Sequence, residues 1–298
     1  MDRVTLTSLA TTVKTHQEGL EQFIQYGIIV PPVVCEKCGS KLSRHEDKRL
    51  SDGFSFRCVK GSCHKSYSIR YRSWLQHVRI GLEIMFKLMY MWCYQFTSKQ
   101  ICHELNLFKL TVSEKFQSFR EVCKIEFAKH EVIGGQGMVV QIDETLIYKR
   151  KYDRGRFPAQ VWVFGGIDEQ GKIFLEVVQQ RNAQTLTEVL LRRVAPRSII
   201  YSDEWRGYTN IPDHFEHYQV NHSQNFVNPV DGTNTQRIEG TWSVLKRVLR
   251  MKGTRKCDDI DGYLSEFIFR SQNKDFPFYA FSALVKKHYN PISHNTQL

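Results

Sequence analysis

Three acidic residues in the second half of the chain lie where carboxylates could do chemistry. Asp143 interrupts a strand-like run, and Asp203 ends the strand predicted over 198–202. Glu239 lies on an amphipathic helix predicted over 235–250. Brought together, carboxylates bind Mg²⁺, and two such ions activate the attacking oxygen and stabilise the leaving oxygen of a phosphodiester. Taken singly, each acid is equally well an exposed or capping residue.

The elements that must position these acids follow a glycine-rich break at 134–137. Alternating apolar residues and turn signals predict strands at 138–144, 161–167 and 172–178 and a helix at 184–194. A strand at 198–202, a short helix, a strand at 216–220 and a helix at 235–250 follow. This order resembles the α/β ribonuclease-H-like fold, which has a mixed five-stranded sheet. There, the first strand, the end of the fourth strand and a later helix bring three carboxylates together, and here those places hold Asp143, Asp203 and Glu239.

Three other acids compete for the same role. Asp168 lies in the turn composition "IDEQGK", so we interpret it as structural. Glu144 and Glu204 follow Asp143 and Asp203 directly, and neighbouring side chains on a strand point to opposite faces. We therefore expect these two to lie behind the metal ligands.

Basic residues flank the predicted catalytic elements. The stretch "TLIYKRKYDRGR" between Glu144 and Phe157 places cations and two tyrosines beside the first strand. A charge run is usually a solvated surface, but this position favours contact with a DNA backbone. On the helix over 235–250, Lys246 and Arg250 share a face with Glu239. This arrangement suits contact with DNA phosphates beside a metal site, and it suits a solvated helix face equally well. The cations of the stretch are Lys149, Arg150, Lys151, Arg154 and Arg156.

Composition supports a polyanionic partner without proving one. The 298 residues carry a net charge of +11, and the isoelectric point is near 9.2. Nucleic acid is the simplest partner for this charge, although a merely basic enzyme would look the same. The N-terminus is polar and no apolar run reaches membrane-spanning length, so we expect a soluble intracellular protein without a membrane partner. Its eight cysteines are then metal ligands or buried thiols.

A cysteine-rich segment precedes the helices. Cys35 and Cys38 form a CxxC pair, and Cys58 and Cys63 follow after a β-prone stretch. Two such pairs predict a structural Zn²⁺ site that supplies folding energy to a segment with little apolar core. The second pair has four intervening residues, so His64 or His45 could replace one thiol. Basic and aromatic residues in the segment favour nucleic acid over protein docking: Lys60, Lys65, Tyr67, Arg70, Tyr71 and Arg72.

The remaining N-terminal sequence is helical. Residues 5–27 predict one amphipathic helix, and 79–128 predict three helices with Thr97 capping the second and Asn106 ending it. The third helix is compatible with a helix-turn-helix whose exposed face carries Ser113, Lys115, Gln117 and Arg120. The predicted domains are an N-terminal helix, a zinc ribbon, a helix-turn-helix-like segment and a catalytic domain with C-terminal helices, over 1–32, 33–73, 74–134 and 135–298.

Several motifs together resemble the Merlin-type DDE transposases, eukaryotic DNA elements with bacterial insertion-sequence relatives. The resemblance runs from about residue 33 to residue 272, and it is carried by "IDETLIYKRKYDRGR", "VWVFGGID", "IIYSDEWRGY", "VNHSQNFVNPVDGTNTQRIEGTWSVLKR" and "GYLSEFIFR". It implies a catalytic triad of Asp143, Asp203 and Glu239 that binds two Mg²⁺ or Mn²⁺ ions. It also implies that His222, Arg237 and Lys246 lie near the active site or the DNA, and Gln236 is an alternative amide ligand.

The resemblance implies a transposase that binds terminal inverted repeats, cuts DNA and transfers the strands to target DNA. Handling two element ends implies at least a homodimer, and a eukaryotic host implies a nuclear location. The alternative is a host-adopted, catalytically silent DNA-binding protein. The three retained acids favour the enzyme, because a protein released from catalysis has no reason to keep them.

Overall fold

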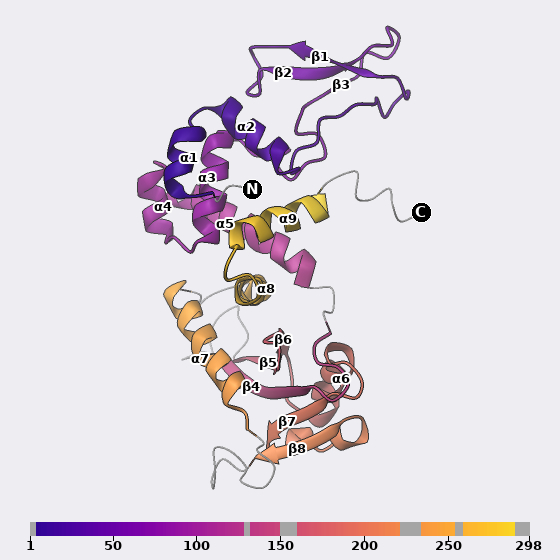
Figure 1. Ribbon diagram of the computed structural model, residues 1–298, viewed down its shortest axis with the longest axis vertical. Helices are drawn as coiled ribbons and strands as arrows, with labels where there is room; N and C mark the ends of the chain where they lie inside the picture. The colour runs from indigo at the N-terminus through magenta and orange to yellow at the C-terminus, as the bar shows by residue number, and fades with distance from the viewer. Residues whose placement is uncertain (1–3, 128–131, 150–159, 221–233, 254–258, 290–298) are drawn as a thin grey trace. The chain divides into compact units, whose positions relative to one another are not determined.

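The structure is a computed structural model that describes residues 4–127, 132–149, 160–220, 234–253 and 259–289 (Figure 1). The chain divides into two compact units. Unit 1 comprises Met1–Val122 and Asp275–Leu298, and unit 2 comprises Cys123–Lys274. Within the described residues, no helix combines the length and the apolar character needed to span a membrane.

Unit 1 begins with two helices, a small sheet and three further helices, and it ends with the C-terminal helix. These elements are α1 (Leu6–Thr12), α2 (His16–Gln25), β1 (Leu42–Glu46), β2 (Phe54–Cys58), β3 (Ser66–Tyr67), α3 (Leu82–Cys93), α4 (Ser98–Glu104), α5 (Lys109–Phe127) and α9 (Pro277–Tyr289). The single helix predicted over 5–27 is divided, because Thr15 and Glu18 form a capping box that starts α2.

The β1–β2–β3 sheet is antiparallel and carries few buried apolar side chains. Arg70, expected on its DNA-facing surface, is instead buried and forms an ion pair with Asp52 at 2.5 Å. The Nη1 of Arg70 also donates to the Val78 carbonyl at 2.8 Å. A buried arginine with these partners is structural. Arg70 is therefore not part of the cationic surface that was predicted for this segment.

Helix α9 packs within unit 1, whereas the sequence had suggested grouping it with the catalytic domain. Its Phe278 ring lies 5.3 Å from Phe86 of α3, and its Phe281 ring lies 4.9 Å from Trp92. Burial of these aromatic faces favours the helical core over the catalytic unit. The predicted cap at Thr97 is present, with a capping box to Gln100.

The helices α4 and α5 are joined by a short turn in which Asn106 adopts a left-handed conformation, with φ of 48°. The helix-turn-helix-like function of this pair stays a prediction. Ser113 and Gln117 are exposed on α5, but Arg120 is only 8% exposed and is unavailable on that face. The expected surface of α5 is therefore smaller than the sequence indicated.

Unit 2 confirms the predicted ribonuclease-H-like order. Its elements are β4 (Val139–Lys149), β5 (Gln160–Asp168), β6 (Ile173–Val178), α6 (Ala183–Arg193), β7 (Ile199–Asp203), β8 (Glu216–Val220), α7 (Gln236–Met251) and α8 (Ile260–Gln272), with short 3₁₀ helices η1 (Arg206–Tyr208) and η2 (Ile211–Asp213) between β7 and β8. The sheet order is β6-β5-β4-β7-β8. Strands β4, β5 and β6 pair antiparallel, and β7 and β8 continue the sheet in parallel with β4.

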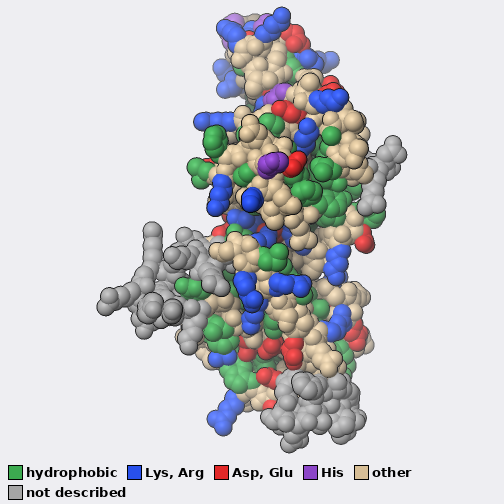
Figure 2. All heavy atoms as spheres, turned by 90° about the vertical axis from the view of Figure 1, so that its left-hand side faces the viewer, with side chains coloured by type: hydrophobic (Ala, Val, Ile, Leu, Met, Phe, Trp, Pro, Cys, Tyr) green, Lys and Arg blue, Asp and Glu red, His purple; other side chains and the backbone are tan. Residues whose placement is uncertain are grey.

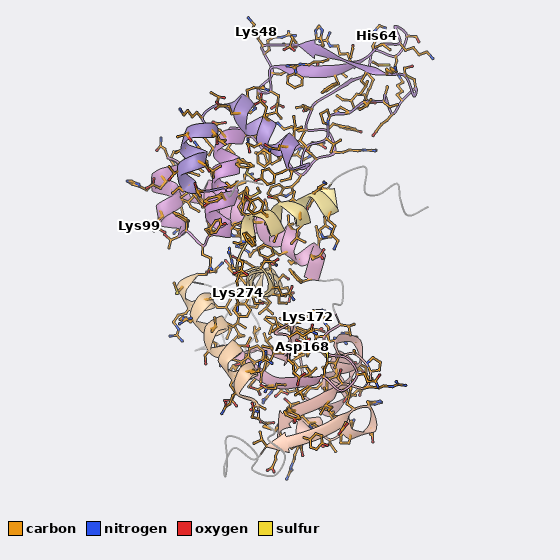
Figure 3. The ribbon with its side chains drawn as sticks, viewed as in Figure 1. Lys48, His64, Lys99, Asp168, Lys172 and Lys274 are labelled. Atoms are coloured by element: carbon orange, nitrogen blue, oxygen red, sulfur yellow. The ribbon has the colours of Figure 1, made fainter. Side chains whose placement is uncertain are left out.

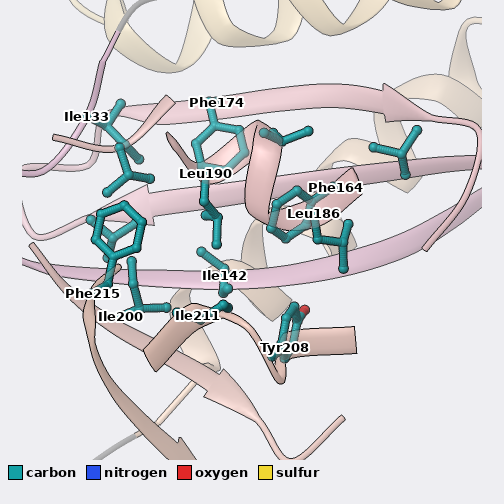
Figure 4. Close-up of a cluster of buried hydrophobic side chains, with 14 residues drawn as sticks. Ile133, Ile142, Phe164, Phe174, Leu186, Leu190, Ile200, Tyr208, Ile211 and Phe215 are labelled. Atoms are coloured by element: carbon teal, nitrogen blue, oxygen red, sulfur yellow. The ribbon is translucent and has the colours of Figure 1, made fainter. Parts of the chain in front are cut away.

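Each face of this sheet has its own core. On one face, α6 and the 3₁₀ helices cover residues such as Ile142, Phe164 and Tyr208, as Figure 4 shows. On the other face, α7 packs Trp242 and α8 packs Leu264 onto the β5 and β6 side chains. Because side chains alternate along β4, successive residues face different cores. This alternation sends Asp143 toward α7 and Glu144 toward the α6 side.

Candidate active site and metal centre

Asp143 is held in the middle of β4 by two hydrogen bonds. Its Oδ1 accepts from the backbone N–H of Glu144 at 2.7 Å, and its Oδ2 accepts from the indole Nε1 of Trp242 at 2.9 Å. The Trp242 ring belongs to the α7 core. The carboxylate is therefore oriented by the packing of a large side chain, which reduces its freedom before any metal binds.

A glycine makes room for that tryptophan. Gly165 pairs with Asp143 across the β4–β5 ladder, and a Cβ atom there would lie 2.6 Å from the Trp242 ring and 2.9 Å from the Phe174 carbonyl. Only a residue without a side chain lets the indole approach the strand this closely. The glycine of "FGG" thus contributes to the position of Asp143.

We predict opposite effects for two Gly→Ala substitutions in this unit. Gly165→Ala should lower the free energy of unfolding by about 1–3 kcal/mol, because overpacking displaces Trp242. Gly240→Ala should raise it by up to about 1 kcal/mol, since this α7 glycine has open space around it and glycine weakens helices. Denaturant unfolding checks both values, and equal effects at the two positions would contradict the packing account.

Gln141 fixes α7 against β4. Its Oε1 accepts from the backbone N–H groups of Arg237 and Ile238 at 2.9 and 3.3 Å, and its Nε2 donates to Asn234 at 3.0 Å. Thr235, at the N-cap, makes no side-chain cap of its own. A side chain from the central strand therefore satisfies the first N–H groups of the helix that carries Glu239.

The other two acids occupy the predicted elements. Asp203 ends β7, and its Oδ1 accepts from the backbone N–H of Trp205 at 3.1 Å. Glu239 lies in the first turn of α7, and its Oε1 accepts from the Thr235 hydroxyl at 2.6 Å. The negative charges of Asp203 and Glu239 reach Asp143, whose pKa is raised to about 6 by burial first and by this repulsion in addition.

The three acids form a cluster of like charge. Raised carboxyl pKa values result when acids are buried near one another without a cation. Within the described part of the chain, the carboxylates do not converge to within 4.8 Å as a ligand group, in contrast to the four thiols discussed below. Oxygen donors from two neighbouring strands and a helix are the ligand type that Mg²⁺ prefers. By the type of their donor atoms, these three residues suit magnesium or manganese.

Glu144 is more perturbed than its predicted supporting role suggested. It is half-buried on the α6 side, and its pKa is raised to about 8, by burial first and by the charges of Asp143 and Asp203. Glu204 is exposed, as expected for a residue that points away from the sheet. Strand alternation predicted the direction of Glu144, but its burial depends on α6 and η1, which the local sequence does not reveal.

These shifts predict a pH dependence of stability in Mg²⁺-free buffer. For Glu144 the pKa rises from 4.5 to about 8 on folding, so the folded chain holds a proton that the unfolded chain releases. Its stabilising contribution is complete below pH 4.5 and is lost as the pH rises through about 8. The loss should be on the order of 2–4 kcal/mol.

The Glu144→Gln variant isolates this contribution. Glutamine mimics the protonated carboxyl, so the variant and the wild type should be similarly stable at acidic pH. Above the raised pKa the variant should be the more stable of the two. Denaturant unfolding at a series of pH values checks this, and a difference that does not change with pH would contradict a proton held at Glu144.

The four predicted zinc ligands converge in unit 1. The Sγ atoms of Cys35, Cys38, Cys58 and Cys63 all lie within 4.8 Å of one another. The Cys35–Cys63 and Cys38–Cys58 sulfur distances are 3.7 and 3.4 Å. Zn–S bonds of about 2.3 Å in a tetrahedron place sulfurs about 3.8 Å apart, so the thiols fit Zn²⁺.

The second cysteine pair needs no histidine to complete the site. His64, labelled in Figure 3, follows Cys63 with a left-handed φ of 52° and is not in the ligand group. Hydrogen bonding from Ser40 lowers the pKa of Cys38 to about 6, whereas burial raises that of Cys58 to about 12. Four sulfurs this close cannot all ionise without a cation, and Zn²⁺ would supply one.

Asp168 is structural, as its turn composition predicted. It is 1% exposed, and its carboxylate accepts from the backbone N–H groups of Gly134 and Lys172 at 3.1 and 2.9 Å. Figure 3 labels Asp168 and Lys172 at the β5–β6 turn. These bonds fasten the turn to the start of unit 2 and leave no free carboxylate oxygen for metal chemistry.

The predicted DNA-contacting residues are only partly described. Arg237, Lys246 and Arg250 are exposed on α7, as is Glu239. Figure 2, which views the α7 side, shows Lys and Arg side chains spread over this face with a group of acidic side chains among them. The others lie outside the described side chains: Lys149, Arg150, Lys151, Arg154, Arg156 and His222.

Comparison with known proteins agrees with the motifs. Residues 134–272 match the family model of the ISXO2-like transposase domain. An "Uncharacterized transposase-like protein" of Haemophilus influenzae is 29% identical over 108 residues, which cover 35% of this chain and 84% of that protein. The segment 134–272 is therefore similar to the ISXO2-like transposase domain, and the predicted resemblance to DDE-type transposases is confirmed.

Solved transposase structures also resemble the chain, at low scores. The Mos1 transposase paired-end complex with the left transposon end is 15% identical with a TM-score of 0.24, covering 68% of this chain and 79% of that one. The Mos1 mariner paired-end complex with Mn is 14% identical with a TM-score of 0.21, covering 68% and 78%.

Proposed function

We propose that this protein is an active DDE transposase whose acids Asp143, Asp203 and Glu239 bind two Mg²⁺ or Mn²⁺ ions. The observation that carries the proposal is the raised pKa of Asp143, caused by burial and by the charges of the other two acids. Three mutually repelling carboxylates on two parallel strands and a helix are costly to keep without a cation. The family of the domain points to the same chemistry.

The chain's own residues would hold this site ready for DNA. Trp242 orients the Asp143 carboxylate, the Trp205 N–H orients that of Asp203, and Gln141 anchors the helix that carries Glu239. When bound, the metal ions would polarise the scissile phosphate and lower the pKa of the attacking oxygen. Water would serve as the first nucleophile, leaving a 3′-hydroxyl at the element end, and that hydroxyl would then attack a phosphodiester of target DNA.

The partners follow from the same proposal. The exposed cations of α7, with the basic run 149–156, would bind DNA phosphates, and unit 1 would read the terminal inverted repeats. We propose that the thiols of Cys35, Cys38, Cys58 and Cys63 hold one structural Zn²⁺. Two element ends would require at least a homodimer. A nuclear location is proposed from the resemblance to eukaryotic elements, although the curated relative named above is bacterial.

A joining assay tests the proposed function. Terminal-repeat DNA that ends in a 3′-hydroxyl is incubated with the protein, Mg²⁺ and a supercoiled plasmid. We expect the repeat to become covalently joined to the plasmid, since each new phosphodiester bond releases one target 3′-hydroxyl. The matched control is the same DNA with a 3′-deoxy end, which should not join. Specific binding without joining in Mg²⁺ or Mn²⁺ would instead favour the silent DNA-binding protein.

A further inference from the structure

An arginine is held between two tryptophans on the α6 side of unit 2. The guanidinium carbon of Arg181 lies 3.6 Å from the ring centroid of Trp162 and 4.9 Å from that of Trp205. Trp162 belongs to β5, and Trp205 lies two residues after Asp203. Arg181 directly precedes Asn182, the N-cap of α6. Three separate segments thus meet beside one of the proposed catalytic acids.

The two indoles are themselves fixed. Both pack against the buried core between the sheet and α6. Trp162 donates from Nε1 to Gln160 at 2.9 Å, and the Trp205 ring lies so close over Gly207 that a Cβ atom there would overlap it. The guanidinium is therefore stacked on anchored aromatic rings, a geometry that holds its plane.

The guanidinium donors of Arg181 have no acceptor among the described residues. Some other arginines of unit 2 are paired with carboxylates: Arg193 with Glu176 at 2.9 Å and Arg270 with Glu266 at 2.7 Å. Within the described part of the chain, no ion pair or hydrogen bond is found for the Arg181 guanidinium, and it is only partly exposed. A stacked guanidinium keeps its in-plane N–H donors available for a bidentate acceptor such as phosphate.

The surroundings of the stack favour an anion. The first turn of α6 carries no acidic residue, so the positive end of its dipole is not offset there. The Trp205 backbone N–H binds Asp203, which links the arginine stack to the end of β7.

We propose that Arg181, clamped by Trp162 and Trp205, binds a backbone phosphate of the DNA strand whose scissile bond lies at Asp203. A planar guanidinium fixed by two rings can present two parallel N–H groups to one phosphate. This inference rests on the proposed function, and it adds a DNA contact outside the basic residues that the sequence indicated.

The salt dependence of DNA binding separates a phosphate contact from a purely structural stack. Each phosphate contact contributes about 0.9 to the slope of log affinity against log salt on duplex DNA. We expect Arg181→Ala to lower this slope by about 0.9 and to reduce kcat/KM for cleavage roughly 10- to 100-fold. Arg181→Lys should keep the slope, because the charge remains, while losing part of the rate along with the planar fork.

Two further variants complete the design. Arg197→Ala removes an exposed arginine at the start of β7, at the opposite end of the strand from Asp203, and should leave both slope and rate unchanged. Trp205→Leu removes one stacking face but keeps the backbone N–H to Asp203, so it should weaken cleavage less than Arg181→Ala does. Thermal unfolding of each variant shows whether the fold survives.

The outcomes distinguish this inference from the proposed function. If the wild type cuts DNA and Arg181→Ala keeps the wild-type salt slope, the proposed phosphate contact of Arg181 is wrong, whereas the proposed transposase function is retained. A slope that falls equally in Arg181→Ala and Arg181→Lys would also overturn it. If the wild type does not cut DNA, the proposed function fails, while the slopes measured by binding alone still test Arg181.

Discussion

Replacing Asp203 by asparagine is expected to lower the rate of metal-dependent DNA cleavage by about a thousandfold or more. Asp203 ends β7 beside Asp143, and its charge contributes to the raised pKa of that residue. Removing one anionic ligand weakens the binding of ions that stabilise transition-state charge by several kcal/mol, and about 4 kcal/mol corresponds to a thousandfold in rate. Glu239→Gln should behave in the same way.

Glu204→Gln is the matched control for this prediction. Glu204 is the next residue after Asp203, but it is exposed and lies beyond the end of β7. This substitution removes one negative charge, as Asp203→Asn does. Because Glu204 is not a proposed metal ligand, cleavage should stay within about threefold of the wild-type rate. DNA affinity in Mg²⁺-free buffer should be retained in all variants. Cleavage by Asp203→Asn within tenfold of the wild-type rate would remove Asp203 from the triad.

Removing zinc is expected to unfold the β1–β2–β3 sheet. The sheet buries few apolar side chains, chiefly Phe54 and Tyr67, so little hydrophobic free energy holds it. A structural Zn²⁺ with thiolate ligands contributes roughly 10–16 kcal/mol of apparent binding free energy, which becomes folding free energy. Cys58→Ser should therefore lose stoichiometric zinc, and the amides of β1 and β2 should exchange with solvent as in an unfolded peptide.

The helices of unit 1 give this experiment its internal reference. Their aromatic core around Phe86 and Trp92 does not include the thiol cluster, so α3 and α9 should stay protected when the sheet unfolds. Cys102→Ser, in a half-buried thiol of α4 outside the cluster, should retain zinc. Sheet amides that stay protected after complete zinc loss would contradict a metal-dependent fold.

The catalytic fold was predictable because its signals are local. Strand alternation and turn residues identified the elements of unit 2, and the position of Asp203 at a strand end is the basis of its proposed role. The fixed order of those elements then placed Asp143 and Asp203 on neighbouring strands. Likewise, the spacing of the cysteines predicted a zinc site, with His64 or His45 left as an alternative to one thiol.

The features that the sequence did not reveal depend on contacts between distant segments. Helix α9 packs in unit 1 because its aromatic side chains contact those of α3. The sequence of α9 alone does not indicate which helix it contacts. Gln141 caps α7 across the core, and Arg181 meets two tryptophans from separate segments. By contrast, the division of the first helix could have been predicted from the sequence, because Thr15 and Glu18 have the spacing of a capping box.

The most direct test of the central claim is cleavage of DNA that carries the element's own terminal repeats. Wild-type protein is incubated with this DNA in Mg²⁺ and, separately, in EDTA, and the ends are mapped to single nucleotides. A metal site formed by Asp143, Asp203 and Glu239 predicts cuts at the repeat ends with free 3′-hydroxyls in Mg²⁺, and none in EDTA. Tight, specific binding with no cutting in either Mg²⁺ or Mn²⁺ would contradict it.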